Sequence, residues 1–303
     1  MRYFIKWVEE SYFQNPSFFG HLLSIAFLPL TLLYCIWISL KRSNARPIDF
    51  GIKIISIGNL VLGGSGKTPI TIEIAKRYKH PAVILRGYGR QTKGMFLASK
   101  SGKILNDVQV VGDEATMFAK SLSNATVIVS EDRKIAIMKA KELGCDVVIL
   151  DDGFGKFDIK KYDILIRPKD EPQNLFCIPS GPYRFPKFFY TLANIVIQDG
   201  VDFQRKVTFK KNGTEVNLGK KVVVITAIAK PFRLKEFLPQ NAIIESFLDH
   251  HNFNDSEIED LFQKYLDFEF VTTSKDLVKL AKFSDKFTLM DLEIHISKNL
   301  NLP

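Results

Sequence analysis

The sequence predicts an α/β protein with a mostly parallel sheet that is covered by helices on both faces. Between residues 52 and 199, short apolar runs alternate with segments of helical spacing, a pattern typical of buried parallel strands. A glycine-rich loop, "GNLVLGGSGKTP" at residues 58–69, follows the first apolar run and precedes a helical segment. This order of strand, loop and helix predicts a fold like that of the P-loop nucleoside triphosphatases.

The individual elements are expected from the spacing of apolar residues. Strands are expected in the apolar runs of 52–57, 82–90, 126–133, 145–154, 162–168 and 193–199; the second runs into a turn, and the third and fourth end in charged residues. Helices are expected where apolar residues recur every three to four positions, at 69–78, 112–122, 133–144, 255–266 and 274–283. Beyond residue 205 the composition changes to polar, hairpin-like turns followed by a new buried strand.

These patterns divide the chain into four segments. An N-terminal segment at 1–46 contains an apolar helix at about 21–40, and the P-loop domain covers 47–204. A hairpin-like linker at 205–220 leads to a second, smaller α/β domain at 221–303.

The net charge of +9 favours an anionic partner: nucleic acid, an acidic membrane surface or a phosphorylated substrate. Lysine and arginine are scattered rather than gathered in a tail, which makes nucleic acid the weakest of the three. The three cysteines, Cys35, Cys145 and Cys177, form no C-x-x-C pair, so neither a disulfide framework nor a zinc site is indicated.

The N-terminal stretch "HLLSIAFLPLTLLYCIWISL" at 21–40 has the length needed to cross a bilayer core. The basic segment "KRSNAR" follows it, and the positive-inside rule places this flank in the cytoplasm. A cleavable signal peptide fits poorly, because no small-residue cleavage site ends the run. We therefore expect a membrane-associated helix, and the sequence leaves open whether it spans the bilayer or lies in the interface. The alternative is a buried or interfacial helix, which Ser24, Pro29 and Thr31 favour.

The glycine loop carries the groups that phosphate binding requires. Glycines let the backbone curl so that N–H groups point at phosphate oxygens, and the set expected to bind the nucleotide is Gly63, Gly64, Ser65, Gly66, Lys67 and Thr68. Lys67 would reach the β- and γ-phosphates, and Thr68 would bind Mg²⁺. Val61 stands where the usual pattern has its first glycine. The alternative is a glycine turn that only caps a helix.

A second magnesium ligand is expected at the end of "DVVILDDGF". Asp151 and Asp152 come directly after an apolar strand, at the sheet edge where ligands of such folds bind. Mg²⁺ takes one or two carboxylates together with phosphate oxygens, and the pattern leaves open which of the two binds it directly. A plain turn before Gly153 is the alternative. Because the chain lacks an N-K-x-D motif for guanine, we expect ATP.

A base near the γ-phosphate should be a carboxylate or a histidine. Asp113 lies at an expected helix start, where capping is its simpler role. The pair His250 and His251 lies beside Asp249 in "DHHNF". Arg86 and Arg90, in "RGYGR", would clamp phosphate or simply form a turn.

Eight motifs, in this order, resemble those of the tetraacyldisaccharide 4'-kinases, the lipid A 4'-kinases of Gram-negative bacteria. They are "SIGNLVLGGSGKTP", "LRGYGR", "VGDEA", "DDGF", "PSGPYRFP", "ITAIAKP", "FLDHHNF" and "VTTSKDLVKL". An apolar N-terminal helix also matches. The family's loop lacks the first glycine too, so Val61 is a shared trait.

The resemblance implies transfer of the γ-phosphate of ATP to the 4'-hydroxyl of tetraacyldisaccharide 1-phosphate, with Mg²⁺, at the cytoplasmic face of the inner membrane. It implies Asp113 as the catalytic carboxylate and His250, rather than His251, as its partner. Phosphate or substrate contacts would come from Arg86, Arg90, Arg184 and His251. No nucleic acid and no obligate protein partner are expected.

The chain also departs from the family pattern, at Gly155, Lys156, Phe185 and Ser274. Gly155 and Lys156 replace Gln-His, Phe185 replaces a Glu thought to help with metal or substrate, and Ser274 replaces another Glu. Gly155 and Phe185 therefore favour an alternative, a membrane-tethered P-loop nucleotide-binding protein without transferase activity. A P-loop ATPase with a protein partner is a third reading, but the chain shows no partner-binding segment.

Overall fold

The computed structural model describes residues 7–63, 66–228, 231–248, 251–297, 299–300 and 302–303. The chain forms two compact units, the first made of 1–85, 133–204 and 296–303, the second of 86–132 and 205–295. This division differs from the predicted boundaries, which kept 47–204 together. Residues 86–132 group with the later part of the chain, where helix α6 (Asp113–Ser121) packs against α9 (Ser274–Leu277). Apolar spacing predicts elements but does not indicate which distant elements pack together.

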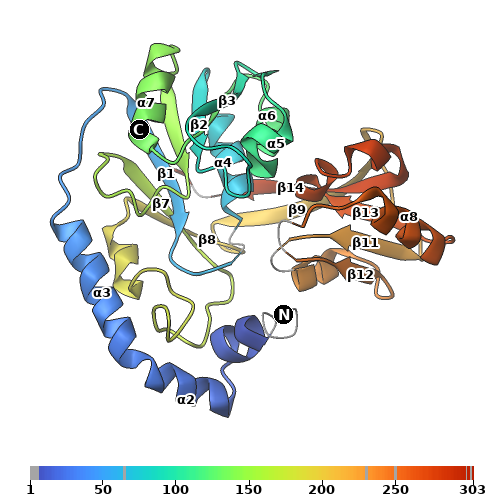
Figure 1. Ribbon diagram of the computed structural model, residues 1–303, viewed down its shortest axis with the longest axis horizontal. Coiled ribbons are helices and arrows are strands. Elements are labelled where there is room, and N and C mark those ends of the chain that lie inside the picture. The colour runs from blue at the N-terminus through green and yellow to red at the C-terminus, as the bar shows by residue number, and fades with distance from the viewer. Residues whose placement is uncertain (1–6, 64–65, 229–230, 249–250, 298, 301) are drawn as a thin grey trace. The chain divides into compact units, whose positions relative to one another are not determined.

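The first unit contains a parallel sheet with the strand order β2-β6-β1-β7-β8. Its strands are β1 (Lys53–Asn59), β2 (Pro81–Leu85), β6 (Val147–Asp151), β7 (Tyr162–Arg167) and β8 (Ile195–Gln198). In the register, Ile57 of β1 lies opposite Asp151 of β6, so the two strands reach the same edge together. The predicted parallel sheet is confirmed for these strands (Figure 1).

Helices pack on this sheet. Helix α4 (Lys67–Ala75) packs on β1, β2 and β6, and α7 (Arg133–Glu142) packs on β2. A 3₁₀ helix, η2 (Lys187–Leu192), contributes Phe189 and Tyr190 to an aromatic core cluster with Phe154, Phe157 and Tyr183. The core therefore extends from the sheet to the segment that precedes η2.

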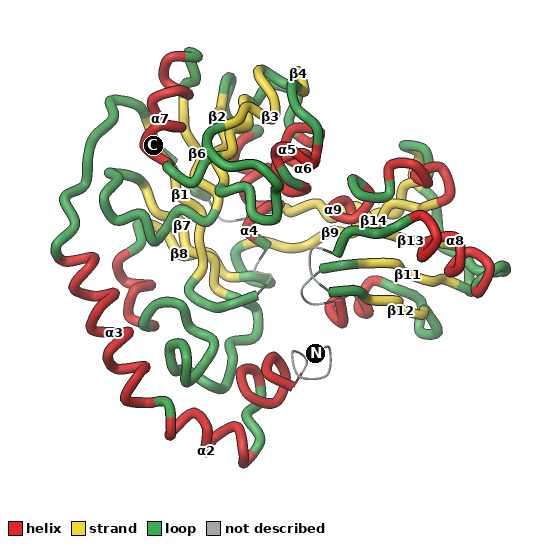
Figure 2. The backbone as a smooth tube through the Cα atoms, viewed as in Figure 1, coloured by secondary structure: helices red, strands yellow, loops and turns green. Residues whose placement is uncertain are grey.

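The apolar N-terminal stretch forms two helices rather than the single helix predicted at about 21–40. A π-helical turn, η1 (Val8–Gln14), precedes α2 (Phe18–Ala26) and α3 (Leu28–Ser43), and α3 is bent by 57° from α2. Pro29 lies in the first turn of α3, where its missing N–H ends the hydrogen-bond ladder of α2. Figure 2 shows the two helices as separate segments. Among the described residues no single helix meets the length and hydropathy of a membrane span; this bent pair meets them only jointly.

The second unit contains two groups of strands. The first group is antiparallel, with β3 (Phe96–Lys100) between β4 (Lys103–Ile104) and β5 (Thr126–Val129), and α5 (Val108–Val111) precedes α6. The other is a six-stranded sheet with the order β10-β9-β14-β13-β11-β12. Its strands are β9 (Phe203–Lys211), β10 (Thr214–Glu215), β11 (Val222–Thr226), β12 (Ile243–Ser246), β13 (Glu269–Thr273) and β14 (Phe287–Ile296).

Strands β9 and β10 form the hairpin expected at 205–220, while β11, β12, β13 and β14 run parallel. The remaining elements are η3 (Pro231–Phe237), α8 (Asp255–Lys264), α9 and η4 (Ala281–Lys286). The single helix predicted at 274–283 is wrong: it is divided into α9 and η4. Leu280 departs from helical geometry between them, where it enters the core of this unit.

Candidate active site

The glycine loop begins where β1 ends and leads into α4. Gly63 and Gly66 have φ angles of 96° and 78°, a left-handed conformation that side chains disfavour. Gly66 directly precedes Lys67, the first residue of α4, so the loop delivers its backbone to a helix N-terminus, where anions bind favourably. Thr68 lies half-buried in the first turn of α4. Gly64 and Ser65 lie outside the described residues.

Val61 is part of the core and not a turn position. Its side chain is buried beside Leu60, Phe154 and Tyr183, and its backbone forms a bridge to Tyr183. Arg184 N–H donates to the Leu60 carbonyl at 2.7 Å, and Leu62 N–H donates to the Pro182 carbonyl at 2.8 Å. The start of the glycine loop is therefore fastened to the "GPYRFP" segment in extended form, where a β-branched residue fits and a flexible glycine is not required.

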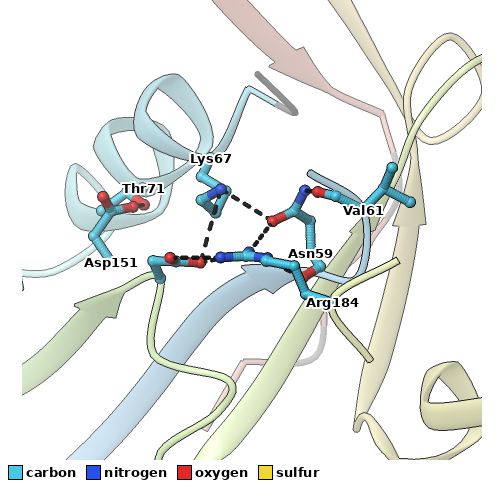
Figure 3. Close-up of polar contacts among 7 residues, drawn as sticks. Asn59, Val61, Lys67, Thr71, Asp151 and Arg184 are labelled. Atoms are coloured by element: carbon cyan, nitrogen blue, oxygen red, sulfur yellow. Dashed lines mark hydrogen bonds and ion pairs between the residues drawn. The ribbon is translucent and has the colours of Figure 1, made fainter. Parts of the chain in front are cut away.

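Two cations, Lys67 and Arg184, converge on the side chain of Asn59 in Figure 3. The Lys67 ammonium donates to Asn59 Oδ1 at 3.0 Å and lies 3.7 Å from Asp152 Oδ1. Arg184 binds Asp152 in a bidentate manner, at 3.0 and 2.9 Å, and donates to Asn59 Oδ1 at 2.5 Å. Asn59 in turn donates to the Val61 carbonyl. This network brings Lys67, Asp152 and Arg184, all predicted site residues, into one place.

Asp152 has an unusual backbone for a non-glycine residue, with φ at 53° directly after β6. Such conformations cost about 1–3 kcal/mol and cluster at functional sites. Burial raises the pKa of the Asp152 carboxyl, but the Arg184 hydrogen bonds and the Lys67 and Arg133 charges outweigh that effect and lower the pKa to about 2. The carboxylate is therefore ionised at neutral pH, and with 44% of its side chain exposed it is accessible to a ligand.

Asp151 is the last residue of β6 and is buried. Its Oδ1 accepts a hydrogen bond from the Thr71 hydroxyl of α4 at 2.9 Å. The bond ties the strand end to the helix that follows the glycine loop, which fixes the spacing between Asp151 and the helix N-terminus. Asp151 therefore has a positioning contact within the site and Asp152 has the more exposed carboxylate.

The remaining predicted contacts lie in the second unit. Arg86 is exposed after β2, whereas the Arg90 side chain is buried and donates to Glu131 Oε1 at 2.6 Å and to the Gly94 carbonyl at 2.5 Å. The Arg90 hydrogen bond lowers the pKa of Glu131 to about 2. Arg90 thus holds its own loop together.

Asp113 is buried at the N-terminus of α6, directly after Gly112. Its Oδ2 lies 3.2 Å from the ammonium of Lys279, which also donates to the main-chain carbonyl of His251 at 3.1 Å. The structure thus connects Asp113 with the backbone of His251 through Lys279. The His251 ring stacks on Phe247, and its Nε2 is 3.1 Å from Glu257 Oε2. His250 lies outside the described residues.

Comparison with known proteins identifies the family to which this chain belongs. A family model described as LpxK, tetraacyldisaccharide-1-P 4'-kinase, matches residues 23–301. The chain belongs to the tetraacyldisaccharide 4'-kinase family. It is 54% identical over 296 residues to the tetraacyldisaccharide 4'-kinase of Aliarcobacter butzleri, covering 97% of this chain and 94% of the relative. The corresponding protein of Helicobacter acinonychis is 42% identical over 288 residues, covering 95% and 90%.

A solved structure supports the same assignment. The crystal structure described as the apo form of LpxK from Aquifex aeolicus in complex with ATP matches with a TM-score of 0.74 and 25% identity, and the match covers 90% of this chain and 95% of that chain. The resemblance that the motifs predicted is confirmed, and with it the α/β fold. As a member of the 4'-kinase family, the chain is an enzyme, an ATP-dependent kinase of lipid A synthesis.

Two departures of this 4'-kinase from the family pattern, Gly155 and Phe185, are explained together because the two residues pack against each other. A Cβ atom built on Gly155 would lie 3.2 Å from Phe185 Cζ, so the Phe185 ring occupies the space beside Gly155. The ring also packs edge-on against Phe154, with centroids 5.2 Å apart, and stacks with Phe189 at 5.9 Å. Gly155 is therefore explained by the size of Phe185. The other departures lie elsewhere: Ser274 begins α9, and Lys156 N–H donates to the Gly153 carbonyl.

We expect Gly155→Gln to destabilise the protein by about 1–3 kcal/mol, because the added side chain overpacks the Phe185 ring. In a Phe185→Ala background the same change should cost clearly less, because the ring is gone. Denaturant unfolding of the two single variants, the double variant and the unchanged protein measures this coupling. Strictly additive losses would show that Gly155 and Phe185 are independent.

Sequence reasoning missed two residues of this 4'-kinase, Asn59 and Lys279. Asn59 is buried and accepts hydrogen bonds from Lys67 and Arg184, and the nearly buried Lys279 forms an ion pair with Asp113. Asn59 has a signal that pattern analysis could have used, since it is the polar end of an apolar strand directly before the glycine loop. Lys279 has none, because a lysine in a helical pattern is ordinarily a solvent-facing residue.

Proposed function

We propose that the enzyme transfers the γ-phosphate of ATP to the 4'-hydroxyl of tetraacyldisaccharide 1-phosphate. The observation that carries the proposal is the convergence of Lys67 and Arg184 on Asp152 beside the N-terminus of α4, in a chain of the 4'-kinase family. Two cations and a helix N-terminus form an anion-binding site suited to a triphosphate. The acceptor substrate is inferred from the name of the family, tetraacyldisaccharide-1-P 4'-kinase.

Each predicted site residue of the first unit has a role in this proposal. Backbone N–H groups of the loop and the Lys67 ammonium bind the phosphates, and Arg184 keeps Asp152 in place until the nucleotide is bound. The donor set of Thr68, Asp151 and Asp152 fits Mg²⁺, which binds one or two carboxylates and otherwise waters and phosphate oxygens. Bound there, Mg²⁺ would neutralise charge on the phosphates, with Asp152 the more accessible ligand.

Asp113 is assigned as the general base that accepts the proton of the 4'-hydroxyl. The carboxylate lies in the first turn of α6, 3.2 Å from the Lys279 ammonium. The partner histidine is assigned to His250. The contacts of the His251 ring with Phe247 and Glu257 support that choice, because they already define the orientation of that ring.

The function is tested by incubating purified protein with Mg-ATP, labelled at the γ-phosphate, and tetraacyldisaccharide 1-phosphate in mixed micelles. Labelled bisphosphorylated lipid is the expected product. The same lipid with its 4'-hydroxyl methylated is the matched control and should accept no label. If ATP binds while no labelled lipid forms, the chain is instead a nucleotide-binding protein without transferase activity.

We further propose that α2 and α3 lie in the membrane interface at the cytoplasmic face of the inner membrane. The face of the pair that packs on the first unit carries polar and apolar residues: Ser24 is 1% and Thr31 5% exposed, both form hydrogen bonds to Ser180, and Ile38 joins the aromatic core cluster. The outer face is apolar and exposed, with Phe18 at 81% and Leu33 at 64%. An apolar face directed away from the protein is suited to lipid. Lys41 and Arg42, in the last turn of α3, would favour anionic headgroups.

Replacing Leu32, Leu33 and Ile36 together with glutamine should lower binding to anionic vesicles at least about tenfold, because these side chains would lose burial in lipid. Leu266→Gln, at an exposed leucine of the second unit, is the matched control and should bind normally. Sedimentation with vesicles of phosphatidylethanolamine and phosphatidylglycerol measures the effect. Undiminished binding of the triple variant would assign attachment to the basic surface instead.

A further inference from the structure

Lys279 is a buried cation that joins two segments of the second unit. Its side chain and that of Asp113 are each only 8% exposed, and their charged groups lie 3.2 Å apart. The same ammonium donates to the His251 carbonyl at 3.1 Å. One side chain therefore contacts both the assigned base and the backbone of His251.

The fold fixes the position of Lys279 through a second buried charge. Asp276, which is fully buried in α9, accepts hydrogen bonds from the hydroxyl groups of Thr226 at 2.6 Å and Thr273 at 2.8 Å. Thr226 ends β11 and Thr273 ends β13, two paired parallel strands. The Lys279 N–H donates to the Asp276 carbonyl at 2.9 Å. The backbone that carries Lys279 is thus anchored to the ends of the sheet.

Stability alone explains this ion pair poorly. Removing two charges from water is costly, and a buried ion pair is often no more stabilising than apolar residues of the same volume. Nor is Lys279 needed to satisfy the start of α6, because the helix dipole there already favours a carboxylate. What the contact does provide is geometry, since engaging Oδ2 restricts rotation of the Asp113 carboxylate and fixes its distance from the His251 backbone.

We propose that Lys279 is a positioning residue for phosphoryl transfer. It orients the Asp113 carboxylate and fixes the position of the His251 backbone relative to that carboxylate. The inference rests on the proposed role of Asp113 as the general base.

The first test is Lys279→Met, which keeps most of the length of the side chain and removes its charge. We expect kcat to fall about 100-fold, because small displacements of a catalytic group cost rate, while KM for ATP changes less than about threefold. Lys279→Arg, which keeps the charge, should recover most of the lost rate. Lys282→Met, at an exposed lysine one turn away that pairs with Asp255, is the matched control and should have normal kcat. Wild-type kcat per folded Lys279→Met protein would overturn the inference.

A double variant covers the case in which Lys279→Met folds poorly because the Asp113 carboxylate has lost the Lys279 ammonium. Asp113→Asn/Lys279→Met has no unpaired charge at this contact and should turn over at the same rate as Asp113→Asn alone, because Lys279 acts through Asp113. A further large loss in the double variant would show that Lys279 acts independently and would overturn the inference. Normal turnover of Asp113→Asn would instead refute Asp113 as the base.

Discussion

Asp113→Ala is expected to lower kcat about 1,000-fold while changing ATP affinity less than about threefold, because a general base acts on the acceptor and typically contributes 10²–10⁴ in rate. Initial rates of lipid phosphorylation and calorimetric titration with ATP measure the two quantities separately. Asp107→Ala, at an exposed carboxylate before α5, is the matched control and should retain normal turnover.

The same substitution leaves Lys279 buried without this carboxylate. Breaking a buried ion pair on one side costs about 3–5 kcal/mol, so Asp113→Ala should also unfold at a lower temperature. Rates must therefore be taken well below the unfolding transition and expressed per folded protein. If ATP affinity falls as much as turnover does, Asp113 supports the fold and is not the base.

Lys67→Ala is expected to lower kcat/KM for ATP about 100- to 1,000-fold, the usual loss when one donor to a developing phosphate or oxyanion charge is removed. The ammonium now lies between Asn59 and Asp152, at the start of α4. Lys76→Ala, at the C-terminal end of the same helix, removes an exposed ammonium and is the matched control.

Steady-state kinetics with varied ATP distinguish the two variants. Lys67→Ala should affect kcat/KM for ATP strongly, whereas Asp113→Ala should affect kcat and leave ATP binding in place. Near-normal kcat/KM for ATP in Lys67→Ala would mean that the glycine loop is a helix-capping turn, as the alternative interpretation of its sequence holds.

The parallel sheet of the first unit could be predicted from the sequence because its strands are continuous apolar runs bounded by glycine and charge. Asp151 and Asp152 could be placed at the sheet edge for the same reason. The break between α2 and α3 was signalled by Pro29, but a proline in a helix start and a proline in a kinked span have the same local sequence. Apolar spacing also did not show that 86–132 packs with the later half of the chain.

The polar partners of the site were the least predictable part. Arg184 could be proposed from its motif, but its bidentate bond joins it to Asp152, 32 residues earlier, and its contact with Asn59 spans 125 residues. Lys279 is similar, since only the packing of α9 against α6 shows that it faces Asp113. Such contacts depend on how distant segments pack, and the spacing of apolar residues in the sequence does not indicate them.

Arg184 also connects the glycine loop to the N-terminal helices. Its main-chain carbonyl accepts a hydrogen bond from the Tyr34 hydroxyl of α3 at 2.6 Å, while its guanidinium holds Asp152. Helix α3 thus packs against the first unit with its inner face, while its outer face is the one proposed to contact lipid. A shortened chain without the first forty residues would lose Tyr34. It would also lose Thr31, whose hydroxyl accepts a hydrogen bond from the buried Ser180 N–H. Polar substitutions on the outer face of α3 would remove its exposed apolar side chains and keep the hydrogen bonds of Tyr34 and Thr31.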